Sequence, residues 1–180
     1  MPYMRDSKLI SQFKDTARKA GATTEEIDSS GEALYDSLLE IAGGSENILM
    51  SEPEFIPVDL FTKIKEKFNI VTKPDTDELA AAEVGITDAF AGIARTGSVC
   101  IAITPGFSSY ISLLPRKHIV ILESKNIVAR PRDIFENHIL KSTIDETGWI
   151  FISGPSATAD MGELVRGVHG PDKLHIILLG

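Results

Sequence analysis

Two short loops combine glycine with hydroxyl side chains, and each follows a predicted strand. The loops are Arg95-Thr96-Gly97-Ser98 and Gly154-Pro155-Ser156-Ala157-Thr158. Glycine lets the backbone approach a ligand closely, and hydroxyls add hydrogen-bond donors. In an open α/β sheet, two such loops can meet in one crevice. They therefore predict a site for a small anionic ligand, for which the Arg95 guanidinium is a suitable partner. The alternative is that Arg95 only pairs with a surface acid.

The second loop precedes an apolar pattern typical of a helix. Apolar residues recur at i, i+3, i+4 and i+7, namely Met161, Leu164, Val165 and Val168. Three residues before the pattern could cap the helix: Ser156, Thr158 and Asp160. The first N–H groups of a helix are unsatisfied and its dipole is positive there, so an anion would be stabilised at this end. The alternative is that these residues serve only as caps.

The histidines and the cysteine give little support for metal or redox chemistry. No pair among His118, His138, His169 and His175 has the i, i+4 spacing of a helical metal site, so we expect no metal. His169 lies in a constrained turn and is a ligand-binding candidate; the alternative, which the frequency of structural histidines favours, is that it only satisfies backbone groups. Cys100 lies in an apolar run and is expected to be buried; one cysteine cannot hold an iron–sulfur cluster. No cofactor motif is evident, so no cofactor is expected.

The helices and strands expected around these loops indicate an α/β fold. Residues 150–152 and 174–179 are apolar runs on either side of the expected helix, which together predict a βαβ unit. Amphipathic helices are expected over 7–20 and 32–42, with another beginning at 23–26, so that residues 1–45 form a helical segment packed on the domain. Further helices are expected over 58–68, 78–83, 110–114 and 132–140, and strands over 48–50, 70–72, 87–94, 98–103 and 118–122.

Length and composition limit the function classes. A chain of 180 residues can form one sizeable domain, and we expect 1–180 to be a single domain. The formal charge of −8 argues against a nucleic-acid surface. No run approaches the ~18 apolar residues of a membrane span, and the N-terminus lacks a signal-peptide core, so a cytoplasmic location is expected.

Several motifs of the C-terminal half match those of a known protein family. The matching segments are SGPSATAD at 153–160, VRGVHGP at 165–171 and LHI at 174–176. Others are Gly85-Ile86-Thr87, Ile93 to Ser98, Leu114-Pro115 and His118 to Val120. With these motifs the chain resembles the LUD domain family, the lactate-utilisation group that includes LutC- and YkgG-like proteins, and the resemblance is strong from Ala81 to the end. It implies an open, mostly parallel sheet with helices on both faces, similar to the NagB/RpiA/CoA-transferase group, and adds Thr87 to the ligand-binding candidates.

The chain departs from the family at two positions. Arg95 stands where family members usually carry a glutamate, and Phe90 replaces an earlier acidic residue. If the family's site uses those acids, this chain has lost that chemistry or moved it.

The resemblance leaves two functions open. The first is an accessory component of lactate or related hydroxy-acid utilisation, acting with separate iron–sulfur and oxidoreductase partner proteins. The second is an enzyme or binding protein for a phosphorylated or CoA/nucleotide-type molecule. The sequence does not decide whether the chain is itself an enzyme.

Overall fold

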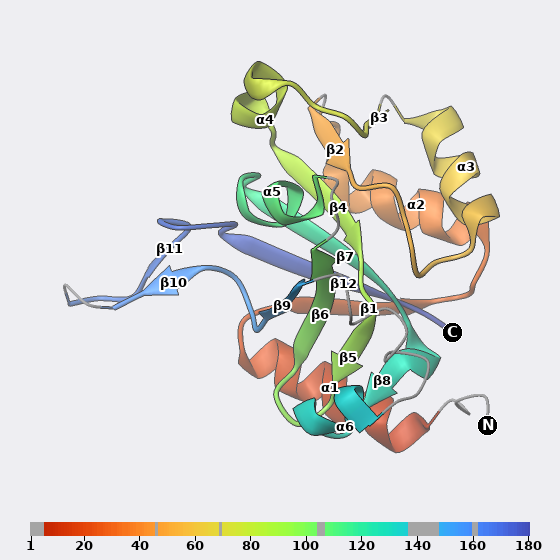
Figure 1. The fold of residues 1–180 in the computed structure, drawn as a ribbon, viewed down its shortest axis with the longest axis vertical. Coiled ribbons are helices and arrows are strands. Elements are labelled where there is room, and N and C mark those ends of the chain that lie inside the picture. The colour runs from red at the N-terminus through yellow and green to blue at the C-terminus, as the bar shows by residue number, and fades with distance from the viewer. Residues whose placement is uncertain (1–5, 46, 69, 104–106, 137–147, 160–161) are drawn as a thin grey trace.

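A six-stranded parallel sheet forms the centre of the computed structural model, which describes residues 6–45, 47–68, 70–103, 107–136, 148–159 and 162–180. Its strand order is β1-β12-β7-β4-β2-β3 (Figure 1). The central strands are continuous runs of valine, isoleucine and leucine, the composition of parallel strands buried on both faces. The strands are β1 (Thr23–Ile27), β2 (Ile48–Met50), β3 (Ile70–Val71), β4 (Val84–Asp88), β7 (Lys117–Glu123) and β12 (Lys173–Leu179).

Helices cover both faces of this sheet. On β7, Val120 and Leu122 pack toward helix α1, whereas Ile119 and Ile121 pack toward helices α2 and α3. This alternation follows from the two-residue period of a strand. The helices are α1 (Ser7–Lys19), α2 (Gly31–Ala42), α3 (Val58–Lys67), α4 (Thr76–Ala81), α5 (Ser108–Leu113) and α6 (Pro131–Glu136), with a 3₁₀ turn at Ser124–Asn126. The predicted α/β class and two-sided helix layout are confirmed.

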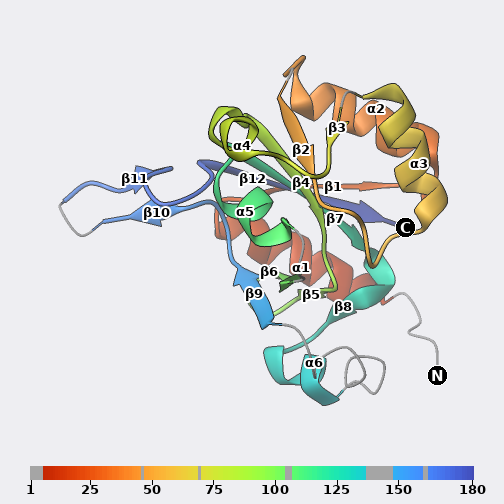
Figure 2. The same cartoon turned by 45° about the horizontal axis from the view of Figure 1, so that its top comes forward.

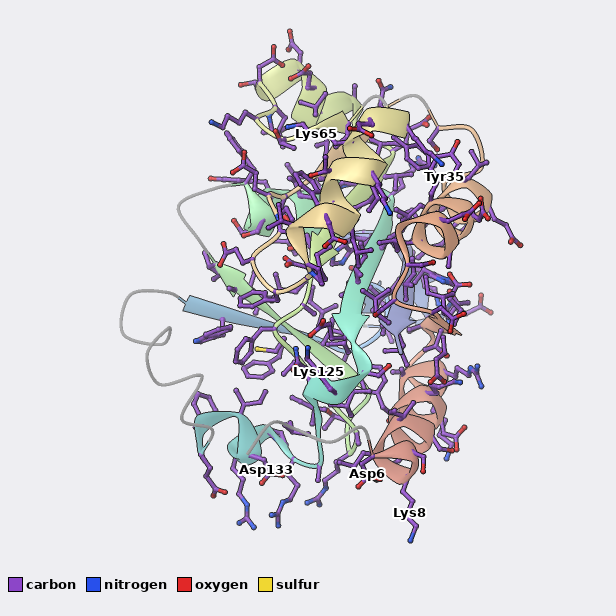
Figure 3. The ribbon with its side chains drawn as sticks, turned by 90° about the vertical axis from the view of Figure 1, so that its right-hand side faces the viewer. Asp6, Lys8, Tyr35, Lys65, Lys125 and Asp133 are labelled. Atoms are coloured by element: carbon purple, nitrogen blue, oxygen red, sulfur yellow. The ribbon has the colours of Figure 1, made fainter. Side chains whose placement is uncertain are left out.

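The outer faces of these helices carry charge. Lys8 on α1 and Lys65 on α3 are exposed, and Figure 3 shows Lys8 pointing away from the body of the protein. No helix of the described residues is both long enough and apolar enough to cross a membrane.

A second, smaller sheet continues from the end of β4. Its order is β8-β5-β6-β9, where β5 is Ala91–Ile93, β6 is Ser98–Ile103, β8 is Ile127–Val128 and β9 is Gly148–Ile152. The single strand expected over 87–94 is therefore divided. The Ala89 N–H still donates to Ile121 of the main sheet, whereas the Phe90 N–H donates to Cys100 of the second sheet. β5 and β6, which lie within the strands expected over 87–94 and 98–103, pair antiparallel and so form a hairpin.

Residues 23–27 form an edge strand, so the helix expected to begin there is wrong. β1 runs parallel to β12, with Thr23 opposite His175. The segment expected to be helical therefore supplies one strand of the main sheet between α1 and α2. The helix expected over 132–140 is present as α6 up to Glu136, and the rest of that range lies outside the described residues.

The helix expected after Ser156 is also wrong. Ala157–Thr158 and Val165–Arg166 instead form two short antiparallel strands, β10 and β11, of an arm that projects from the body (Figures 1 and 2). Leu164, Val165 and Val168 are all more than half exposed, so their helical spacing does not reflect a buried face. β9 pairs with β6 and β12 with β7, which places the two strands of the expected βαβ unit in different sheets. β9 is partly exposed rather than buried.

Candidate functional site

The two predicted loops meet beside the end of α1. The Ser98 hydroxyl lies 2.6 Å from the Ser153 hydroxyl and donates to Thr96 Oγ1 at 2.7 Å. Both loop glycines pack directly on the helix. A Cβ on Gly97 would lie 2.2 Å from the Ala17 nitrogen, and a Cβ on Gly154 would lie 2.0 Å from the Ala20 oxygen. At both positions glycine is required because any larger residue would clash with the backbone at the end of α1.

The helix end at this meeting point has the wrong polarity for an anion. The loops contact the C-terminal end of α1, where the helix dipole is negative and carbonyl oxygens point outward. The helix N-terminus expected at Ser156 is replaced by β10. An anion at Ser156 would therefore need donors other than helix N–H groups.

A cavity of about 300 Å³ lies beside the second loop. Its walls come from α5, β9, the start of β7 and the two segments that lead into and out of the arm. The lining includes three predicted site residues, Gly154, Ser156 and His169. The other polar side chains that line it are Ser112, His118 and Ser153.

A larger open hollow of about 700 Å³ adjoins this cavity. The two share Leu113, His169 and Gly170. The hollow is also lined by Arg116 and Arg166, together with Asp172. We call the cavity the inner cavity and this region the outer hollow.

His118 is the most unusual group of the inner cavity. The residue is 1% exposed, and its Nε2 lies 2.9 Å from the Thr87 hydroxyl. Its Nδ1 has no hydrogen-bond partner within the described part of the chain. Burial lowers the pKa of His118 to about 3, so the imidazole is neutral at physiological pH. Thr87, itself a predicted ligand-binding residue, is fully buried and contacts this imidazole.

The remaining predicted residues lie elsewhere. Arg95 and Thr96 are exposed and line neither hollow, and the Arg95 backbone N–H donates to Ala129 at 3.1 Å. Thr158 lies on the arm in β10, and Asp160 lies outside the described residues. The structure thus places Gly154, Ser156 and His169 around one cavity. The other loop residues, Arg95, Thr96, Gly97 and Ser98, line neither this cavity nor the larger hollow.

The sequence hypothesis did not include His118, Arg116 or Arg166 as site residues. A histidine at the second position of an otherwise apolar strand is a usable signal, because a buried imidazole needs hydrogen-bond partners. Arg166 lies within the matched motif at 165–171 and Arg116 directly follows Leu114-Pro115, but nothing in their spacing indicates that they share a hollow.

At the opposite edge of the main sheet, the carboxylate at the end of β4 binds the backbone of the segment that follows β2. Ligands of open α/β sheets commonly bind at the carboxyl ends of the strands. At the end of β4, however, the N–H groups of Glu54, Phe55 and Ile56 donate to Asp88 Oδ2 at 2.7, 2.5 and 3.2 Å. Burial raises the pKa of Asp88, while these three donors oppose that shift by favouring the carboxylate. The inner cavity lies at the other edge, where β7 and β12 begin with His118 and Leu174 on its wall.

Metal and thiol chemistry find no support in the geometry. The described residues contain no group of three or more histidine, cysteine, aspartate or glutamate side chains suited to a metal ion. Cys100 is buried as expected, and burial raises the pKa of its thiol to about 12. A thiol with such a pKa is a poor nucleophile at neutral pH.

Comparison with known proteins decides the family. The model of the LUD domain matches residues 10–179, which is nearly the whole chain. The chain belongs to the LUD domain family. This LUD domain is 30% identical to lactate utilization protein C of Bacillus subtilis, across 95% of the chain and 78% of that relative. It is also 30% identical to lactate utilization protein C of Bacillus licheniformis, across 98% of the chain and 80% of the relative.

A solved structure has the same fold. The LUD domain superposes on the crystal structure of a DUF162 family protein from Deinococcus radiodurans with a TM-score of 0.74. The match covers 99% of the present chain and 100% of that chain at 22% sequence identity. At this identity the likeness concerns the fold alone.

Proposed function

We propose that this LUD domain is a component of lactate utilisation that acts with separate electron-accepting partner proteins. The observation that carries the proposal is its similarity to lactate utilization protein C over 95% of its length. Related hydroxy acids carry the same hydroxyl and carboxylate groups and are included in the proposal.

The chemistry of lactate explains why partners are required. Oxidation of lactate to pyruvate releases two electrons and two protons, and an enzyme normally passes such electrons to a cofactor. The single cysteine of this chain is buried in the second sheet. One thiol cannot supply the ligands of an iron–sulfur cluster, so the proposal places such clusters on partner chains and assigns no cofactor to this one.

Deletion of the gene in its own host tests the pathway assignment. We expect the deletion strain to grow poorly with lactate as the carbon source and normally with pyruvate, which enters metabolism after the oxidation step. A plasmid copy of the wild-type gene should restore growth on lactate. Equal growth of the deletion and parent strains on lactate would contradict the assignment.

Affinity purification tests the partner requirement. The tagged chain, isolated from cells grown on lactate, should carry proteins with iron–sulfur or other redox centres. The purified chain alone should not reduce an electron-accepting dye when lactate is added, and the co-purified assembly should. Lactate-dependent dye reduction by the chain alone would show that no partner is needed.

A further inference from the structure

The inner cavity and the outer hollow together form a site of two chemically different halves. The inner cavity is largely apolar, with walls from Leu113, Ile150, Phe151 and Leu174. The outer hollow is lined by the charged residues Arg116, Arg166 and Asp172. His169 belongs to both linings and so marks the passage between them.

His118 can offer a hydrogen-bond donor to the inner cavity. Within the described residues, the Thr87 hydroxyl has no hydrogen bond other than that with His118 Nε2. A buried hydroxyl needs an acceptor for its proton, and Nε2 fills this role when the ring proton is on Nδ1. Nδ1–H is then a donor without a protein acceptor, on a side chain that lines the cavity. An unpaired buried donor is costly, and a ligand oxygen or ring nitrogen would satisfy it.

The outer hollow supplies positive charge. Neither Arg116 nor Arg166 forms an ion pair within the part of the chain that the structure describes, and both are exposed. A guanidinium presents a planar fork of donors that matches the oxygens of a carboxylate or a phosphate. Asp172 offsets part of this charge and disfavours a second anionic group on its side of the hollow.

Lactate is too small to fill the inner cavity. Ligand pockets of about 300–1,000 Å³ enclose molecules of drug-like size, and the inner cavity alone measures about 300 Å³. A six-atom hydroxy acid would leave most of its apolar wall uncovered.

We propose that the two hollows bind a single organic anion larger than lactate. Its apolar, acceptor-bearing part fills the inner cavity against His118, and its phosphate or carboxylate lies in the outer hollow at Arg116 and Arg166. This site is independent of the role in lactate utilisation and can exist whether or not that role is correct.

Isothermal titration calorimetry with four probes tests the proposal. AMP and 4-hydroxybenzoate carry a ring with a phosphate or a carboxylate, adenosine lacks the anionic group, and L-lactate lacks the ring. The variants are Arg116→Ala, Arg166→Ala and His118→Phe, with Arg132→Ala as the matched control. Arg132 is exposed, lies on α6 and lines neither hollow.

We expect AMP or 4-hydroxybenzoate to bind more tightly than both adenosine and L-lactate. AMP and adenosine differ only in the phosphate, so the ratio of their affinities measures the contribution of that group. Each arginine variant should weaken that binding about tenfold, as expected for loss of one charge-assisted contact, and Arg132→Ala should not. His118→Phe should also weaken binding; if it fails to fold, the arginine variants still decide.

Three results would overturn the proposal. The first is that no probe binds at millimolar concentration. The second is that adenosine or L-lactate binds as tightly as the ring-bearing anions. The third is that Arg116→Ala and Arg166→Ala bind as the wild type does.

Discussion

A single neutral imidazole in the core gives the protein a specific sensitivity to acid. Burial holds the pKa of His118 at about 3, well below the ordinary value of 6.5. As the pH falls from about 6.5 toward 3, His118 takes up a proton in the unfolded chain but not in the folded chain. The free energy of unfolding therefore decreases as the pH falls, and the contribution is absent above about pH 6.5.

Replacement of His118 should remove this sensitivity. Between about pH 6.5 and pH 4, the wild type should lose roughly 1 kcal/mol per pH unit more than His118→Phe does. Urea denaturation at a series of pH values measures both slopes. Parallel slopes for the wild type and His118→Phe would show that His118 takes up a proton in the folded state.

The partner of His118 could not be predicted from the sequence. Thr87 is 31 residues away along the chain and lies on the neighbouring strand β4. Composition and spacing indicated both strands but not their order in the sheet. They therefore could not predict the contact between Thr87 and His118. The buried state of Cys100, in contrast, depends only on its apolar neighbours and was predicted correctly.

Helices and strands were predicted correctly where the local sequence pattern and the tertiary contacts favour the same secondary structure. Strands β7 and β12 and helices α1, α2 and α3 have strong apolar patterns and were predicted. β1 has one apolar residue, Ile27, and owes its place to β12 and to the hydrogen bonds of Glu25 with Ser37 and His175. The arm was mistaken for a helix because spacing alone does not show whether a face is buried.

The docking of the second loop on α1 gives a prediction at this scale. Gly154 has φ +76°, and a Cβ there would meet the Ala20 oxygen at 2.0 Å. Gly154→Ala should therefore combine backbone strain with a clash and lower the free energy of unfolding by about 3 kcal/mol or more. Chemical denaturation measures the loss.

Gly44→Ala is the matched control for Gly154→Ala. Gly44 has a similar φ of +79° but nothing within 4 Å of a Cβ, so only the backbone strain of about 1 kcal/mol applies. The difference between the two variants measures the contact between loop and helix. Equal losses would indicate that the loop moves away from α1 without cost.

In the whole molecule, the two edges of the main sheet at which its parallel strands begin and end have different roles. At the carboxyl edge, three backbone N–H groups donate to Asp88, whereas the inner cavity lies at the amino edge. The resemblance-based expectation of a CoA-transferase-like sheet gave the correct class. The position of the cavity could not follow from it, because that position depends on how the second sheet and the arm pack on the amino ends of β7 and β12.

Asp88 should hold the segment 54–56 at the carboxyl end of β4. Asp88→Ala removes the acceptor of three backbone N–H groups and leaves buried donors unpaired, which should cost about 3 kcal/mol. Hydrogen exchange should show loss of protection at Glu54, Phe55 and Ile56. Asp88→Asn keeps an acceptor oxygen and should retain more of this protection. Unchanged exchange in Asp88→Ala would show that other contacts hold the segment.

The projecting arm and the inner cavity share their supports. Ser156 and Gly167, at the two roots of the arm, are joined by a hydrogen bond from the Gly167 N–H to the Ser156 oxygen at 2.9 Å. Ser156 lines the inner cavity and Gly167 lines the outer hollow. The base of the arm and the linings of both hollows are therefore parts of the same stretch of backbone. A displacement of the arm relative to the body would also displace Ser156 and Gly167, and by thermodynamic linkage a ligand that contacts these residues would favour one position of the arm.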